Sequence, residues 1–311
     1  MKPDLLITGP MYPPTLAELE ATYTAHRYWS APDKNALLAQ VADKVTAVAS
    51  SNSGGIDGAT IAQLPKVKVI AHFGVGYDTV DMEAARARGI PVTNTPDVLT
   101  EEVADLTLAL LLATVRRVPQ GDRYVREGKW LKGSMALTES LQGKTLGIIG
   151  IGRIGRAIAR RAGAFNLRVI YQGPNKKADL SWAYFADPVA LAREADFVVA
   201  ACPGGEATRG LVSRAVIEAL GPKGTLVNIS RGSVVDEPAL IEALQSGKLG
   251  SAGLDVFADE PRVPEALLAM DNVVLQPHVA SATHQTRKAM GQLVIDNLAA
   301  HFAGRPLLTP V

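Results

Sequence analysis

Short apolar runs alternate with longer stretches of helical pattern along nearly the whole chain. The runs show no polar alternation, which is typical of strands covered on both faces and hence of parallel sheets in an α/β fold. One series of runs lies at residues 5–8, 45–49, 67–71 and 91–94. A second series lies at residues 145–150, 169–172, 197–202, 226–230, 252–256 and 273–276. The pattern therefore predicts two doubly wound sheets.

Helix boundaries support this division. Asp81 is a suitable N-cap for a helix over residues 82–88 that ends at Gly89, and Gly247 ends a helical run that follows Pro238. Long helical patterns over residues 100–116 and 282–302 flank the second series. We therefore expect a discontinuous outer domain, residues 1–98 and 282–311, with residues 99–281 inserted as a second domain.

One segment fits neither pattern. Residues 121–143 mix charged side chains with Trp130, and we expect this stretch to form an arm for self-association. Trp130 could reach the substrate cleft of a partner subunit or pack at a dimer interface, and the sequence leaves both alternatives open.

Composition narrows the class of protein. The chain has 311 residues, 47% of them hydrophobic, and a net charge of +1, so no overall field favours nucleic acid or an anionic membrane. The longest apolar stretch, residues 106–115, is far shorter than the roughly 20 residues that span a bilayer. The N-terminal apolar run is too short for a signal peptide. With Cys202 as its single cysteine, the chain is expected to be a cytoplasmic protein.

A glycine-rich turn opens the second series of strands. Residues 145–150 predict a buried strand and residues 156–164 a helix, and Gly150-Ile-Gly152-Arg-Ile-Gly155 lies between them. In a dinucleotide-binding turn the first glycine permits the tight turn, the second admits the pyrophosphate, and the third allows close helix packing. The backbone N–H groups of Arg153 and Ile154 would then face phosphate at a helix N-terminus.

The next strand indicates which dinucleotide is preferred. An enzyme that prefers NAD usually has an acidic residue after this strand, where it binds the ribose hydroxyls. Here Gly173-Pro174-Asn175-Lys176-Lys177 follows, and the first acid is Asp179. An amide and two ammonium groups attract the 2′-phosphate of NADP, so we expect NADP(H) to be preferred and NAD(H) to serve as well.

Three polar residues follow later strands of the same series. Arg231, Glu260 and His278 come after strand-like runs, and ligands of open α/β sheets bind at the carboxyl ends of strands. Reduction of a 2-oxo acid needs a hydride and a proton. Imidazole titrates near neutrality, so His278 is the candidate proton donor, with Glu260 to orient it and favour its charged form. Arg231 is suited to bind a carboxylate and polarise a carbonyl.

These residues give the chain a recognisable pattern. It resembles the D-isomer-specific 2-hydroxyacid dehydrogenases, and within them the glyoxylate/hydroxypyruvate reductases. The likeness rests on residues 72–78, 94–105 and 144–155, and on the order Arg231, Glu260, His278 with gaps of 29 and 18 residues. It implies a Rossmann-type coenzyme domain inserted in a discontinuous flavodoxin-like substrate domain. It also implies a cleft that closes around a small 2-oxo or 2-hydroxy acid, usually in a homodimer.

The resemblance also implies further contacts. Substrate would bind at the Gly74-Val75-Gly76 turn, and Asn52 and Leu99 would line the cleft, together with Arg231 and His278. The remaining positions implied to lie beside the cofactor are Thr107, Cys202, Pro203, Thr208, Ile229, Arg231, Asp255, His278 and Ser281. No metal is expected.

Two alternatives remain beside reduction of glyoxylate and hydroxypyruvate to D-2-hydroxy acids. One is a reductase for aromatic 2-oxo acids such as hydroxyphenylpyruvate, because the sequence does not give the pocket volume. The other is a dinucleotide-sensing, corepressor-like binding protein, which can retain the same three residues. The loop at residues 50–55 offers no lysine or arginine beside Val75, which argues against a phosphorylated substrate.

Overall fold

The computed structural model describes residues 2–311, which divide into two compact units. The first unit contains residues 2–99 and 282–311, and the second contains residues 100–281. The division falls after Leu99, one residue later than the sequence predicts. Each unit is an α/β structure with a fully parallel sheet. No helix in residues 2–311 has the length and apolar character needed to cross a bilayer.

The first unit has a five-stranded sheet in the order β2-β1-β3-β4-β5, the flavodoxin-like order. Its strands are β1 (Asp4–Ile7), β2 (Thr24–Arg27), β3 (Val45–Ser51), β4 (Val69–Phe73) and β5 (Val92–Thr93). Its helices are α1 (Pro13–Thr22), α2 (Lys34–Val41), α3 (Gly58–Ala62), α4 (Met82–Ala87) and α12 (His284–Phe302). Helix α12 packs on β4 and α1, which joins the C-terminal segment to the N-terminal one.

The second unit has a seven-stranded sheet in the order β12-β11-β10-β9-β6-β7-β8. Its strands are β6 (Thr145–Ile149), β7 (Arg168–Gln172), β8 (Ala183–Phe185), β9 (Phe197–Ala200), β10 (Thr225–Asn228), β11 (Ser251–Leu254) and β12 (Val273–Leu275). The order reverses between β6 and β9, as in a Rossmann sheet. Because such crossovers are right-handed, the helices before and after this point cover opposite faces.

The helices of the second unit are α5 (Thr100–Val115), α6 (Val118–Arg126), α7 (Arg153–Ala164), α8 (Pro188–Glu194), α9 (Arg214–Leu220), α10 (Glu237–Gln245) and α11 (Glu265–Leu268). Short 3-10 helices are η1 (Lys129–Lys132), η2 (Glu206–Thr208) and η3 (Gly232–Val234). Helix α5 packs against α7 and against β10 and β11, and a large apolar core lies between the sheet and helices α8 to α10.

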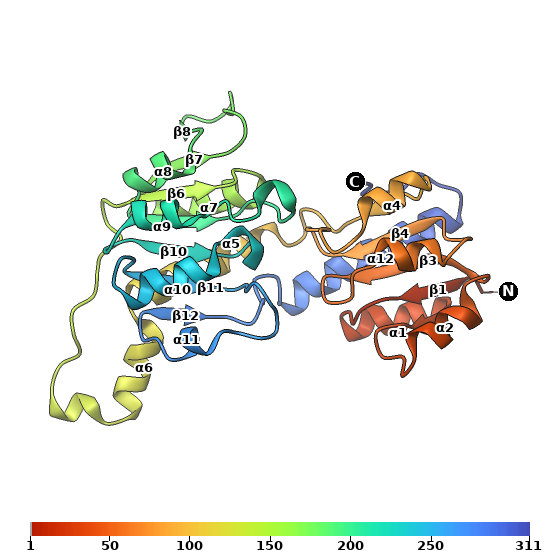
Figure 1. The fold of residues 1–311 in the computed structure, drawn as a ribbon, viewed down its shortest axis with the longest axis horizontal. Coiled ribbons are helices and arrows are strands. Elements are labelled where there is room, and N and C mark those ends of the chain that lie inside the picture. The colour runs from red at the N-terminus through yellow and green to blue at the C-terminus, as the bar shows by residue number, and fades with distance from the viewer. Residues whose placement is uncertain (1) are drawn as a thin grey trace. The chain divides into compact units, whose positions relative to one another are not determined.

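Most predicted elements are present, and the differences have physical reasons. Strands β2 and β8 were not predicted. Strand β2, at an edge of its sheet, has the sequence Thr-Ala-His-Arg and so contains no apolar run. Strand β8, also at an edge, has only three residues. The prediction that the stretch from residue 121 is irregular was wrong in part, since α6 extends to Arg126. Figure 1 shows α6 and the segment after it lying away from the sheet of the second unit. Their exposed apolar side chains include Trp130, 68% exposed, and Leu131, 93% exposed.

Candidate active site

Three loops meet at the carboxyl end of the second unit's sheet. Arg231 follows β10, Asp255 follows β11 and His278 follows β12. Since these three strands are neighbours, their carboxyl ends lie side by side at the edge where open α/β sheets bind ligands. The sheet thus brings together residues that are far apart in the sequence.

A hydrogen-bonded pair forms the centre of this edge. His278 Nδ1 lies 2.7 Å from Glu260 Oε2, and the backbone N–H of Phe257 donates to Glu260 Oε1 at 3.0 Å. Both carboxylate oxygens are therefore engaged, which fixes the orientation of the imidazole. Partial burial raises the pKa of Glu260, but the hydrogen bond and positive charge of His278 outweigh it, so the pKa lies below its ordinary value. Glu260 is thus a carboxylate at neutral pH.

Asp255 holds the loop that contains His278 through hydrogen bonds to its backbone. Its side chain is fully buried and accepts hydrogen bonds from the backbone N–H groups of Val279, at 2.7 Å, and Ala280, at 3.0 Å. The N–H of His278 donates to the Asp255 carbonyl at 2.8 Å. These bonds hold His278 at a φ of 53°, a left-handed conformation that non-glycine residues seldom adopt. Burial is the main reason that the pKa of Asp255 lies above its ordinary value.

Arg231 supplies positive charge close to the pair. Its guanidinium Nη1 donates to the Ser230 carbonyl at 2.9 Å, and Asn228 Nδ2 donates to the Arg231 carbonyl at 2.9 Å. The charge of Arg231 is one of the interactions that lower the pKa of Glu260. A cation, a carboxylate and an imidazole therefore lie within electrostatic reach of one another. This arrangement can bind an anion and deliver a proton to it.

The glycine turn between β6 and α7 fits a dinucleotide. Gly150 has a φ of 98°, and a Cβ there would lie 2.5 Å from the backbone N of Cys202. A Cβ at Gly155 would lie 2.2 Å from the Gly150 carbonyl oxygen, whereas a Cβ at Gly152 would meet nothing within 4 Å. The first and third glycines are thus required by packing, and the space over Gly152 stays open for a ligand. Helix α7 begins at Arg153 and directs its first N–H groups to this space.

The loop after β7 is anchored by two tyrosines. The hydroxyl of Tyr171 accepts from the N–H of Lys177 at 2.8 Å, and the hydroxyl of Tyr184 donates to the Gly173 carbonyl at 3.1 Å. The Pro174, Asn175 and Lys176 side chains between them are exposed. Asp179, the first acid after this strand, pairs with Arg156 of α7 at 2.6 Å. Arg156 was not among the predicted site residues, and it neutralises the acid nearest the loop.

The other predicted cofactor positions vary in accessibility. Cys202 is buried, which raises the pKa of its thiol to about 11, so it is a packed residue and not a nucleophile. Thr208 donates to the Pro203 carbonyl at 2.6 Å, while Ile229 and Ser281 lie in the loops after β10 and β12. The Thr107 side chain is fully buried in α5 and donates to the Val103 carbonyl. Its contact with the cofactor stays a prediction that its burial does not favour.

The predicted substrate residues lie in the first unit. Val75 and Gly76 form a turn after β4, Asn52 lies after β3, and Leu99 is buried at the end of this part of the chain. Asn94, which was not predicted, donates through Nδ2 to the Val75 carbonyl at 2.9 Å. A buried histidine, His72, also contacts this turn. A histidine within a strand gives no sequence signal that separates it from the core.

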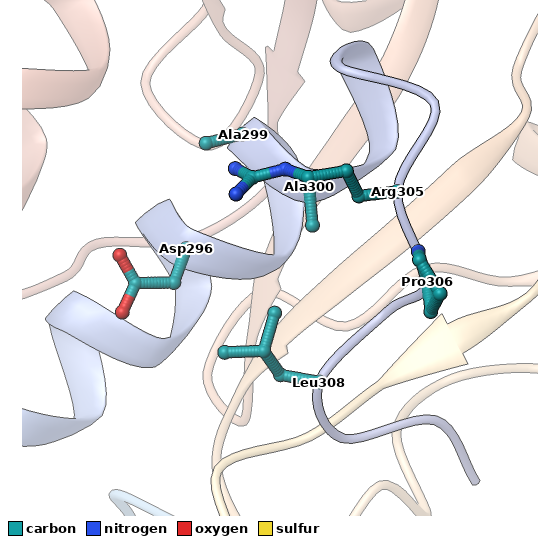
Figure 2. Close-up of a pocket in the computed structure, with 6 residues that line it drawn as sticks. All are labelled: Asp296, Ala299, Ala300, Arg305, Pro306 and Leu308. Atoms are coloured by element: carbon teal, nitrogen blue, oxygen red, sulfur yellow. The ribbon is translucent and has the colours of Figure 1, made fainter.

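A separate hollow of about 370 Å³ lies in the first unit, beside the end of α12 (Figure 2). Its lining residues are Asp296, Ala299, Ala300, Arg305, Pro306 and Leu308. None of the predicted site residues lines this hollow.

The Rossmann sheet, the glycine turn and the His278–Glu260 pair define an α/β oxidoreductase that binds a nicotinamide dinucleotide. Comparison with known proteins agrees with this assignment. The family model for the D-isomer specific 2-hydroxyacid dehydrogenase NAD binding domain matches residues 108–280. The chain belongs to the D-isomer specific 2-hydroxyacid dehydrogenase family, and the resemblance inferred from the sequence is confirmed.

Individual relatives cover nearly the full length. The chain is 50% identical to glyoxylate/hydroxypyruvate reductase A of Arabidopsis thaliana, over 94% of each protein. It is 48% identical to hydroxyphenylpyruvate reductase of Plectranthus scutellarioides, over 99% of this chain and 98% of that protein. A similar solved structure is that of an NADPH-dependent glyoxylate/hydroxypyruvate reductase from Sinorhizobium meliloti in complex with NADP and malonate. Its TM-score is 0.95 and its sequence is 45% identical, and the match covers 100% of this chain and 97% of that one. These likenesses confirm an enzyme that uses NAD(P).

Proposed function

We propose that the protein is an NADPH-preferring reductase that converts small 2-oxo acids, glyoxylate and hydroxypyruvate, to D-2-hydroxy acids. The observation that carries the proposal is the His278–Glu260 pair, with Nδ1 and Oε2 at 2.7 Å, at the same sheet edge as Arg231. The relatives with the corresponding names and the NADP-bound structure of one of them support it.

In this proposal, NADPH supplies the hydride that adds to C2 of the substrate when both are bound. Arg231 binds the carboxylate and polarises the carbonyl, and its fixed planar charge stabilises the developing alkoxide. His278 donates the proton through Nε2, because Nδ1 is directed to Glu260. Glu260 stabilises the imidazolium before the transfer, and the neutral imidazole takes a new proton from solvent afterwards. We also propose that Asn52, Val75, Gly76 and Leu99 bind substrate.

The preference for NADPH rests on charge. Lys176 and Lys177 lie in the loop after β7, and the nearest acid, Asp179, is paired with Arg156. We propose that Asn175, Lys176 and Lys177 bind the 2′-phosphate, which carries charge that NADH lacks. NADH would serve as a weaker cofactor because it still satisfies the glycine turn.

A second candidate function is reduction of aromatic 2-oxo acids, favoured by the 48% identity to a hydroxyphenylpyruvate reductase. One experiment separates the candidates: initial rates of NADPH and NADH oxidation with glyoxylate, hydroxypyruvate, phenylpyruvate and hydroxyphenylpyruvate. Faster NADPH oxidation with the two small acids supports the first proposal, and preference for the aromatic acids supports the second. No turnover with any acid would contradict both and favour a binding-only role.

We further propose a homodimer in the cytoplasm. The exposed apolar side chains of the arm, including Val125, Trp130, Leu131 and Leu137, support self-association, and the last of these is 98% exposed. A single cysteine fits a reducing compartment. Light scattering on the wild type and on Leu131→Glu tests the dimer: two subunits for the wild type and dissociation of the variant are expected. A monomeric wild type would contradict it.

A further inference from the structure

His72 makes several side-chain hydrogen bonds within the first unit, although it has no part in the proposed hydride and proton transfers. Its side chain is fully buried on β4. Nδ1 lies 2.9 Å from the hydroxyl of Ser50, and Nε2 lies 2.9 Å from both Asn52 Oδ1 and the Gly76 carbonyl oxygen. A backbone carbonyl can only accept a hydrogen bond, so Nε2 must carry the proton.

That proton determines how the Asn52 amide is oriented. Because Nε2–H donates, Asn52 must present Oδ1 to it, and the opposite amide orientation would set two donors against each other. Nδ2 of Asn52 is therefore directed away from His72. In residues 2–311, Nδ2 donates to no protein acceptor. The amide also packs on Gly74, where a Cβ would lie 3.0 Å from Oδ1 and 2.8 Å from His72 Nε2.

The carbonyl groups of the turn are each held by a donor. The N–H of Thr95 donates to the Gly74 carbonyl, Asn94 Nδ2 to the Val75 carbonyl and His72 Nε2 to the Gly76 carbonyl, each at 2.9 Å. In a trans peptide the N–H points opposite to the C=O. Each of the next three N–H groups, those of residues 75–77, therefore points away from the donor that holds the carbonyl of its own peptide. Within the described part of the chain none of these N–H groups donates to a protein acceptor.

We propose that His72 is a positioning residue for substrate binding: through Nε2–H it orients the Asn52 amide and fixes the Gly76–Tyr77 peptide. Asn52 Nδ2 and the Tyr77 N–H are thereby presented as donors to the carboxylate of a 2-oxo acid. The inference rests on the proposed function, since it assigns a further role within that substrate site. It extends the anion-binding turn by one N–H and one side-chain donor.

Two substitutions at one position test this role. Asn places its polar atom near the position of Nδ1, whereas Gln reaches the position of Nε2 and can donate there. His72→Asn should raise KM for hydroxypyruvate about tenfold, because it removes two hydrogen bonds of modest strength, while KM for NADPH stays within about twofold. His72→Gln should restore most of the loss. Equal KM values for His72→Asn and the wild type, or equal loss in both variants, would overturn the proposal.

A binding measurement without turnover separates this inference from the proposed function. Calorimetric titration with oxalate, a planar dicarboxylate, should show wild-type binding that weakens about tenfold in His72→Asn and recovers in His72→Gln. If this holds but no 2-oxo acid is turned over, the inference stands and the proposed function fails. Equal oxalate affinity in all three proteins, or no binding by the wild type, overturns the inference.

Asn52→Asp provides a second test should His72→Asn not fold. The aspartate can still accept the Nε2–H bond, so the turn is kept, but its second oxygen replaces the Nδ2 donor with negative charge. The oxalate affinity and 1/KM for hydroxypyruvate should each fall at least tenfold, and the melting temperature should change little. Unchanged values for both would show that Nδ2 does not face the anion and would overturn the proposal.

Discussion

Each unit presents a glycine-containing turn at the carboxyl end of a parallel strand, but the two turns are fixed by different means. In the second unit, Gly150 has a positive φ, and both Gly150 and Gly155 lie too close to backbone atoms for any Cβ. In the first unit, Gly74 lies outside the left-handed region, and its nearest neighbours are the side chains of His72 and Asn52. One turn is determined by backbone packing, the other by side-chain hydrogen bonds.

The difference determines how each turn responds to change. A turn that rests on backbone contacts depends on glycine itself, because backbone atoms cannot move aside cheaply. A turn held by side-chain donors depends on residues elsewhere in the chain. In the proposed function both turns are binding elements, whereas His278 takes part in the reaction. Substitutions should therefore divide into those that affect turnover, cofactor binding and substrate binding.

The largest effect is expected where neither turn is involved. His278→Ala should lower kcat for hydroxypyruvate by about 10²–10⁴, because general acid catalysis contributes about that factor. NADPH affinity, measured by fluorescence titration, should stay close to the wild-type value, because the glycine turn is intact. Full turnover of the variant at neutral pH would exclude His278 as the proton donor.

The glycine turn of the second unit allows a matched pair of substitutions, one at a crowded glycine and one at an open glycine. Gly155→Ala places a Cβ 2.2 Å from a backbone oxygen, so it should lower the stability by about 1–3 kcal/mol and weaken NADPH binding. Gly152→Ala meets nothing within 4 Å and should keep its melting temperature while losing NADPH affinity. Thermal unfolding and NADPH titration of both variants measure the contrast. Equal melting temperatures for the two variants would contradict the account of how this turn is fixed.

Substitutions in the loop after β7 should have a smaller effect, which is confined to the choice between NADPH and NADH. Replacing Lys176 and Lys177 together by Glu removes two cations beside the proposed 2′-phosphate position and adds repulsion. The ratio of kcat/KM for NADPH to that for NADH should fall about 10–100-fold, mostly through NADPH. The Lys→Gln pair serves as control and should fall less. A ratio unchanged in both double variants would show that this loop does not select the cofactor.

The smallest effect concerns pH and the side chain that orients His278. The pKa of Glu260 lies below its ordinary value of 4.5, so its contribution to stability is present above that value and is lost as the pH falls through the lowered one. Glu260→Gln should therefore melt at a lower temperature than the wild type at pH 7, and the two melting temperatures should converge as the pH falls through the lowered pKa. A difference that persists undiminished in acid would contradict the assigned pair.

The sequence predicts the elements whose signal is local. The glycine turn lies between an apolar run and a helical stretch, and Arg231, Glu260 and His278 each follow an apolar run. The local caps also agree, because Asp81 accepts the N–H of Ala84 at the start of α4. These features need no knowledge of which segments meet in the fold.

The rest depends on contacts between distant segments. His72 binds Asn52 across 20 residues, and Asp255 binds Val279 across 24, and neither pairing leaves a pattern in the sequence. The hydrogen bonds of Asp255 to the loop of His278, and those of His72 to Asn52 and Gly76, are therefore seen only in the structure. The edge strand β2 was not predicted for a related reason, since its pairing with β1 is a contact between separate segments and its own sequence has no apolar run.

The most direct test of the central claim is to follow the hydride. NADPH that carries deuterium at both C4 positions should be oxidised with hydroxypyruvate, and the product analysed by mass spectrometry and chiral chromatography. The account predicts one deuterium at C2 of a D-2-hydroxy acid. A product without deuterium, or of L configuration, would contradict it.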